Sequence, residues 1–268
     1  TQILVITWVT VCTLFSLIPL VITILNAFKG HLEIESNIFA FPKFATIMKK
    51  ILPPEHPNLA AAYNNTGTTY NNLGDHRKAL EYQQTALEIR KKVLPPEHPD
   101  LADSYNQVGA TYRHLGNYSK GLEYQLQALA IRERVLPPEH PDLADSYHSV
   151  GIIYTDLGDH RKSLDYQQKA LMIREKVLPS NHPNLAHSFS NIAWTYHELG
   201  NFQKAAQSMR QAADIITHAD LPKTHPSLIN YPRWAAELEK KAELQRKLLA
   251  LPMDQVSGLT PFRILPQK

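Results

Sequence analysis

The chain has 268 residues, enough for one or two domains, and its 20% charged and 43% apolar residues are typical of a folded soluble protein. The formal net charge is only +3, without a long run of Lys or Arg, which argues against a nucleic-acid-binding surface. Because Cys12 is the single cysteine, an internal disulfide and a thiolate metal cluster are excluded.

The first segment of the chain is apolar. Residues 1–28 carry no charge, and Ile3 to Phe28 are mostly Ile, Leu, Val, Thr and Phe. This stretch is long enough to cross a hydrocarbon layer of about 30 Å, so the sequence predicts a separate N-terminal helix that anchors the protein to a membrane through residues 3–28. A cleaved secretion signal and a wrongly assigned exon are the alternatives. The lysines that follow weakly favour a cytoplasmic location for the rest of the chain: Lys29, Lys43, Lys49 and Lys50.

Internal periodicity decides the fold of the remaining residues. Leu94–Val135 and Leu136–Val177 share 27 of 42 residues without a gap. Leu52–Val93 and Leu178–Ala219 carry the same pattern, the second of them more loosely. Four consecutive copies of one unit indicate a solenoid, in which each unit buries its apolar surface against its neighbours.

Each copy is predicted to form two helices. The first begins at a proline such as Pro99, whose missing N–H costs nothing in the first turn, and ends before a glycine such as Gly116 that suits the left-handed conformation. The second begins after an Asp or Asn that can cap it, such as Asn117. It ends at the Leu-Pro-Pro of the next copy, because proline cannot continue the hydrogen-bond ladder. Small residues on both helices allow their axes to approach closely: Gly67, Gly109, Gly151 and Ala193 on the first, and Ala86, Ala128, Ala170 and Ala212 on the second.

The order of residues within a copy resembles the tetratricopeptide repeat family. Its pattern of an aromatic residue, an aliphatic-glycine pair, a tyrosine and spaced alanines is met by Tyr105, Val108-Gly109, Tyr112 and Ala128. The 42-residue period and the sequence HPDLA…ALAIRERVLPPEHP are similar to the kinesin light chain subclass. The resemblance covers roughly residues 44–240 and implies an all-α fold, a right-handed α-α superhelix of antiparallel helix pairs. We expect slightly looser packing where the family usually has an aromatic residue and this chain has Gln83, Gln125 and Gln167.

The two ends of the array complete the predicted organisation. Residues 44–51 align with the tail of a second helix. At the other end, His225-Pro226 starts a fifth first helix, and residues 231–248 continue it with a charged amphipathic pattern that suits a terminal cap. The predicted segments are an apolar segment 1–28, a linker 29–43, a remnant second helix 44–51, four repeats 52–93, 94–135, 136–177 and 178–219, a capping helix 220–250 and a flexible tail 251–268.

The sequence offers little chemistry. Among the 13 histidines, one recurs before a proline in every repeat, at His56, His98, His140 and His182. Successive copies should lie about 10 Å apart, too far to share a zinc ion, so we expect them to shape the start of a helix. No phosphate-binding loop, dinucleotide fingerprint or nucleophile elbow occurs. The sequence therefore predicts no cofactor, no metal and no enzymatic activity.

The resemblance places function on the first helices, which in this family line a concave face that takes extended peptides. The matching positions here are Asn64, Asn65, Thr68 and Asn71, then Asn106, Gln107 and Arg113, then His148, Ser149 and Ile152, and finally Ser190, Asn191 and Trp194. An asparagine can donate to and accept from a peptide backbone at once. Arg113 and the histidines would favour acidic residues, and Trp194 would hold an apolar anchor. We expect other proteins as partners, bound through linear peptide motifs, and a merely solvated polar face is the alternative.

Two further functions stay open at this level. The chain can be the accessory interaction region of a larger enzyme whose catalytic domain lies outside this sequence. It can also be a structural array that self-associates through the N-terminal end of its repeats, near residues 44–51. Fold-level resemblance alone does not decide between these functions.

Overall fold

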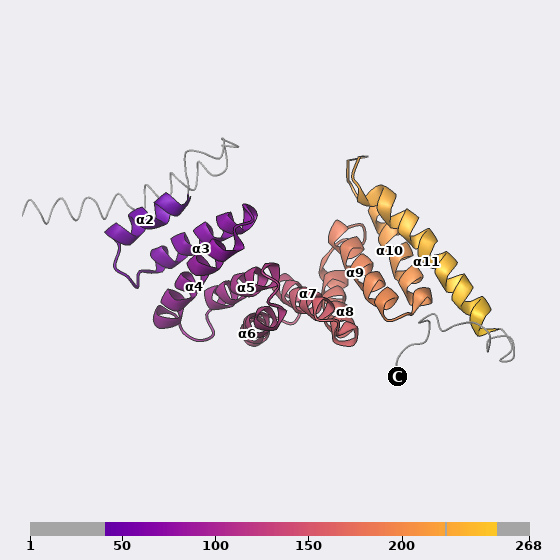
Figure 1. Cartoon of the computed structure of the whole chain (residues 1–268), viewed down its shortest axis with the longest axis horizontal. Helices are drawn as coiled ribbons and strands as arrows, with labels where there is room; N and C mark the ends of the chain where they lie inside the picture. Colours follow the sequence, from indigo (N-terminus) through magenta and orange to yellow (C-terminus); the bar gives the residue numbers. More distant parts are fainter. Residues whose placement is uncertain (1–40, 223, 251–268) are drawn as a thin grey trace, which may run out of the picture. The chain divides into compact units, whose positions relative to one another are not determined.

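The computed structural model describes residues 41–222 and 224–250, and these residues contain helices and no strand. The predicted apolar segment 1–28 and tail 251–268 lie outside this range, so both stay predictions. No helix in the described range is long and apolar enough to cross a membrane. The helices are α2 (Phe41–Ile51), α3 (Pro57–Asn72), α4 (His76–Val93), α5 (Pro99–His114), α6 (Tyr118–Val135), α7 (Pro141–Asp156), α8 (His160–Val177), α9 (Pro183–Glu198), α10 (Phe202–His218) and α11 (Ser227–Leu249) (Figure 1).

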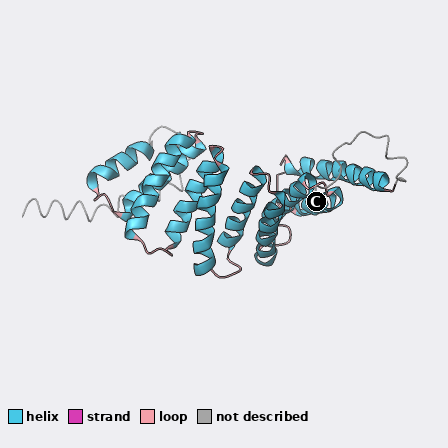
Figure 2. Ribbon diagram, turned by 60° about the horizontal axis from the view of Figure 1, so that its bottom comes forward, coloured by secondary structure: helices cyan, strands magenta, loops and turns pink. Residues whose placement is uncertain are grey.

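The helices pack in the order of the chain. Each first helix packs on the second helix of its own repeat, as α5 does on α6, and each second helix then packs on the next first helix, as α6 does on α7. Successive first helices also touch, α3 with α5 and α5 with α7. Figure 2 shows the same series of neighbouring helices. The predicted all-α solenoid of antiparallel helix pairs is confirmed.

The helix ends follow from the residues that the repeat places there. Glycines with φ between 72° and 80° end the first helices, which confirms the left-handed conformation expected at Gly116 and its equivalents. The Asn117 side chain accepts a hydrogen bond from the backbone N–H of Lys120 at 3.2 Å, and its counterparts cap α4, α8 and α10 in the same way. Local chemistry therefore defines every repeat boundary in the described array.

The recurring histidines are the N-caps of the first helices. In His98 the Nδ1 atom accepts the backbone N–H of Asp100 at 3.1 Å, and His56, His140 and His182 repeat this geometry at 3.1 Å. The Nδ1 atom of each ring thus satisfies one of the backbone N–H groups that the first helical turn leaves without a partner. The structural role expected for these four residues is confirmed.

Helix α2 begins inside the segment that the sequence analysis assigned to a linker. The linker was expected to extend to residue 43, but the helix already begins at Phe41. A proline at its second position is compatible with this start, since the N–H of the first helical turn has no partner within the helix. The interpretation of residues 44–51 as a remnant second helix stays a prediction.

Two of the three glutamines for which looser packing was expected form hydrogen bonds that connect neighbouring repeats. Gln83 is 1% exposed, and its Oε1 accepts the hydroxyl of Thr111 on the next first helix at 2.6 Å. Gln167 accepts from Thr195 at 3.0 Å in the same way. Between them, Gln125 faces Ile153, which has no hydroxyl, and its Nε2 instead donates to the backbone oxygen of Asn106 while its Oε1 is buried without a partner.

Arginines on the second helices form a parallel set of polar links. Arg132 on α6 donates to the hydroxyl of Ser146 on α7 at 2.7 Å and to the carboxylate of Asp103 on α5 at 2.6 Å. Arg174 repeats this arrangement with Ser188 and Asp145. Each guanidinium is largely buried and joins the first helix of its own repeat to that of the next.

The histidine caps are testable at one repeat boundary. His140→Ala removes the acceptor for the Asp142 N–H, and we expect the free energy of unfolding to fall by about 1 kcal/mol in urea denaturation. His140→Asn keeps an acceptor at the cap and should retain most of the stability. Equal losses in the two variants would contradict the capping role.

The glutamine links predict an order of stability between two matched variants. Gln83→Met removes a hydrogen bond between repeats. Gln125→Met removes a buried oxygen that has no partner, together with a hydrogen bond to the Asn106 backbone oxygen of its own repeat. Methionine is accommodated at the corresponding place in α10, where Met209 is buried. We expect Gln125→Met to be more stable than Gln83→Met by about 1 kcal/mol in the same denaturation experiment. The reverse order would show that the link to Thr111 contributes nothing.

Candidate functional site

The candidate residues lie along one surface, which we call the first-helix face: the side of α3, α5, α7, α9 and α11 on which these helices contact one another. The hydroxyl of Thr68 donates to Gln107 Oε1 at 2.9 Å, linking α3 to α5. Arg113 on α5 forms an ion pair with Asp156 on α7. The rings of His148 and Trp194 continue the series, with centroids 5.4 Å from His187 and 5.6 Å from Trp234 respectively. The structure therefore brings candidates from all four first helices onto one surface.

At the N-terminal end of this face the candidates differ in how free they are. Asn65 and Thr68 are exposed. Asn71 is engaged, since its Nδ2 donates to Thr111 at 2.5 Å and its Oδ1 lies 2.9 Å from His76 Nδ1. Asn64 is buried, and its Oδ1 has no hydrogen-bond partner among the described residues. Asn65 and Thr68 are thus the side chains that a ligand meets directly here.

The positive charge of Arg113 is paired with a carboxylate of the protein itself. Its guanidinium donates to both carboxylate oxygens of Asp156, and both side chains are partly buried. Sequence reasoning assigned Arg113 to the face but did not identify Asp156, which lies one residue beyond the corresponding position of the next repeat. An acidic ligand would have to compete with this carboxylate, so Arg113 gives the face little preference for acidic residues.

The histidines of the face are also poor cationic groups. Burial lowers the pKa of His148 to about 4, assisted by the positive charge of Arg174 and by His187. The pKa of His187 is lowered by burial and by Arg174, and that of His114 by burial and by His76. Neighbouring Ser149 turns its hydroxyl toward the backbone oxygen of Asp145 at 2.9 Å, and Ile152 is half-buried. The middle of the face is therefore neutral at neutral pH.

The C-terminal end of the face carries an aromatic pair, the exposed Trp194 and the half-buried Trp234. Trp194 on α9 is 47% exposed and lies beside Trp234 on α11. One turn earlier, Asn191 has a buried Nδ2 atom with no acceptor among the described residues, and Ser190 donates to the backbone oxygen of His187 at 2.8 Å. Next to the pair is a hollow of about 310 Å³ lined by α11 residues: Asn230, Tyr231, Arg233, Trp234 and Glu237.

These α11 residues were missed because the sequence analysis treated the helix as a polar cap. The fifth first helix was predicted from His225-Pro226, which repeats the His-Pro start of the earlier first helices with one residue more between the copies, but its residues were not carried onto the face. Carrying Ser190, Asn191 and Trp194 forward by 43 residues gives Arg233, Trp234 and Glu237, three residues that line this hollow. The helix α11 thus extends the first-helix face as well as ending the array.

No metal centre accompanies the site. Within residues 41–222 and 224–250, no three His, Cys, Asp or Glu side chains are arranged to hold a metal ion. The first-helix face has amide side chains on α3, neutral side chains on α7 and an aromatic pair on α9 and α11. This arrangement is suited to binding.

Comparisons with known proteins agree with this architecture. Models of the tetratricopeptide repeat match residues 59–100, 100–176 and 150–217. Two solved structures of a kinesin light chain-type protein of Podospora anserina, with nearly identical TPR-like repeats, are 24% identical to this chain. Their TM-scores are 0.63 and 0.60, over 75% and 74% of this chain and 94% and 100% of theirs.

A third solved structure has the same fold at a similar sequence identity. BtubC (BKLC) from P. vanneervenii is 22% identical, with a TM-score of 0.59 over 65% of this chain and 72% of that chain. A comparison with curated protein sequences gives no match. At these identities the likeness is one of fold, including the kinesin light chain-like form of the repeat.

The buried His148 predicts a specific pH dependence. Between its ordinary pKa of 6.5 and its folded pKa of about 4, the unfolded chain binds more protons than the folded chain. The contribution of His148 to the free energy of unfolding is therefore fully present above pH 6.5, and it is lost as the pH drops toward 4. We expect the urea midpoint to fall between pH about 7 and pH about 5, and to fall less in His148→Gln. An identical fall in both proteins would show that His148 is not a source of the effect.

Proposed function

Because this chain belongs to the tetratricopeptide repeat family, we propose that it is a non-catalytic scaffold whose first-helix face binds an extended peptide segment of a partner protein. The family supports protein interaction in general. The identity of the face as the peptide-binding surface, and the features of the peptide, are the proposal.

One observation carries the proposal: an exposed tryptophan stands one helical turn from an amide donor without an acceptor. Trp194 and Trp234 together offer an apolar surface large enough to hold a ligand side chain. Asn191 Nδ2 lies buried without an acceptor among the described residues, and it would donate to a peptide carbonyl if ligand binding turned the amide toward the surface. Exposed aromatic residues of this kind dominate the affinity of many protein interfaces.

The rest of the face constrains what the peptide contains. Asn65 and Thr68 are exposed at the far end; the Asn65 amide can donate to and accept from a peptide backbone, and the Thr68 hydroxyl, which donates to Gln107, can still accept. The neutral histidines and the paired Arg113 add little charge between the two ends. We therefore expect an extended peptide with an apolar or aromatic residue that contacts Trp194, and with no strong requirement for acidic residues.

The test begins with peptides selected on the full chain from a random library and measures their affinity by fluorescence anisotropy. Trp194→Ala should weaken binding by about thirtyfold, the loss of one strong contact. The triple variant Asn65→Glu, Asn106→Glu and Asn191→Glu should abolish it, because added carboxylates repel peptide carbonyls along the whole face. Ile47→Ala, on the exposed surface of α2, is the control and should bind as the unchanged chain does.

The reverse pattern would reject the proposal. If Ile47→Ala weakens binding and Trp194→Ala does not, the N-terminal end of the array is the binding surface. Circular dichroism of each variant separates a lost contact from a lost fold.

A further inference from the structure

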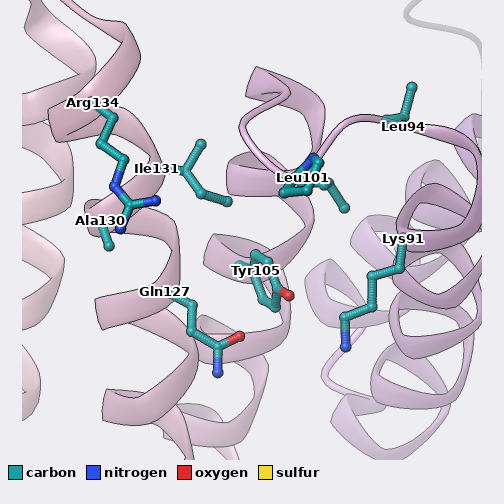
Figure 3. Close-up of a pocket in the computed structure, with 9 residues that line it drawn as sticks. Lys91, Leu94, Leu101, Tyr105, Gln127, Ala130, Ile131 and Arg134 are labelled. Atoms are coloured by element: carbon teal, nitrogen blue, oxygen red, sulfur yellow. The ribbon is translucent and has the colours of Figure 1, made fainter.

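A second hollow lies away from the first-helix face, and we call it the α4–α6 pocket. Its volume is about 470 Å³, and none of its lining residues is a candidate of the first-helix face. It is formed by the end of α4, the segment that follows, the start of α5 and one side of α6 (Figure 3). The lining residues are Lys91, Leu94, Pro96, Leu101, Tyr105, Gln127, Ala130, Ile131 and Arg134.

The floor of the pocket is apolar and its two sides are cationic. Leu101 and Ile131 belong to the buried core and form the floor with the Tyr105 ring. Lys91 and Arg134 stand on opposite sides of this floor (Figure 3). The Lys91 ammonium lies 5.5 Å from the centre of the Tyr105 ring. No carboxylate lines the pocket, so it combines an apolar surface with positive charge alone.

Both cations have acidic neighbours outside the pocket. Lys91 lies 3.6 Å from Glu88, and Arg134 lies 3.4 Å from Glu97. All four side chains are more than two-fifths exposed, and exposed pairs of this kind contribute only about 0–1 kcal/mol. Either cation can therefore exchange its present partner for a ligand carboxylate at little cost.

The near-identical repeats show which residues create the pocket. At the place of Ala130 the other repeats have Glu88, Met172 and Asp214, and at the place of Lys91 they have Lys49, Glu133 and Glu175. Only the repeat with the α4–α6 pocket combines a small residue with two cations. One repeat further on, the hydroxyl of Tyr147 donates to Glu133 at 2.7 Å, and Met172 extends from α8. The pocket is thus a property of this repeat that the solenoid fold does not require.

We propose that the α4–α6 pocket binds an acidic peptide segment that places one apolar side chain on the floor. The apolar side chain covers Leu101, Ile131 and the Tyr105 ring, and carboxylates on either side of it reach Lys91 and Arg134. A volume of this size lies within the range of sites for small ligands and accommodates one large side chain. The proposal is independent of the first-helix face, since the two sites share no residue.

The probe is a fluorescein-labelled pentapeptide with a central leucine between aspartates, tested on the full chain by anisotropy. Saturable binding is expected, weak because of its size. Control peptides replace the leucine by serine or the aspartates by lysines, and both should bind at least about tenfold more weakly, because each loses one of the two contributions. Equal binding of the serine peptide, or no saturable binding of the leucine peptide, overturns the proposal.

Two variants of the chain locate the binding. Ala130→Met introduces the residue found at the same place one repeat on, and should weaken binding by about tenfold without unfolding the chain. Trp194→Ala should leave it unchanged, which separates this site from the first-helix face. Unchanged affinity in Ala130→Met overturns the proposal.

A gain-of-function variant keeps the test independent of any damage to the original pocket. Glu133→Lys together with Met172→Ala recreates the lysine and the small residue one repeat further on, where Tyr147, Leu143 and Lys176 already match. Titration should then show a second site for the leucine peptide. Failure to gain that site, in a variant with an unchanged helical spectrum, counts against the proposed recognition.

Discussion

The contact between the second helix of one repeat and the first helix of the next determines the rest of this structure. The apolar clusters show it, since Leu87 of α4 packs with Leu101 of α5 and Leu129 of α6 with Leu143 of α7. The same interface carries the buried polar links of Arg132 to Ser146 and of Gln83 to Thr111. A helix pair on its own would expose this surface and leave these groups without partners, so every repeat depends on its neighbour.

The binding surfaces follow from that dependence. Because α5, α7 and α9 are each held between a preceding and a following second helix, side chains at equivalent positions recur along one face. The face gains its aromatic end only because α11 packs on α10 and brings Trp234 beside Trp194. The α4–α6 pocket forms where the second helices α4 and α6 flank the start of the first helix α5. The small side chain of Ala130 on α6 leaves this space open. The first-helix face and the α4–α6 pocket both arise from the packing of neighbouring repeats, and residues that differ between repeats determine their chemical character.

The sequence was sufficient for the repeat, its helix ends and its caps, because Pro99, Gly116 and Asn117 act through neighbours within a few residues. It was insufficient for the partners of the candidate residues. The pairing of Arg113 with Asp156 spans 43 residues and depends on how successive first helices are aligned. The hydrogen bonds of Gln83 and Gln167 could not be predicted for the same reason, since their partners lie on the next repeat. The period of a pattern specifies which helices meet, whereas individual contacts depend on tertiary packing.

The gapless similarity of the two middle repeats has a consequence for how this protein can change. Each unit contains its own start and stop residues, so a recombination event that inserts or removes one whole unit leaves every helix boundary intact. An added unit between α6 and α9 would move the tryptophan pair away from the α4–α6 pocket by about 10 Å, the distance between packed helices, without altering either surface. The spacing between two recognition sites would then evolve in discrete steps, independently of their specificity.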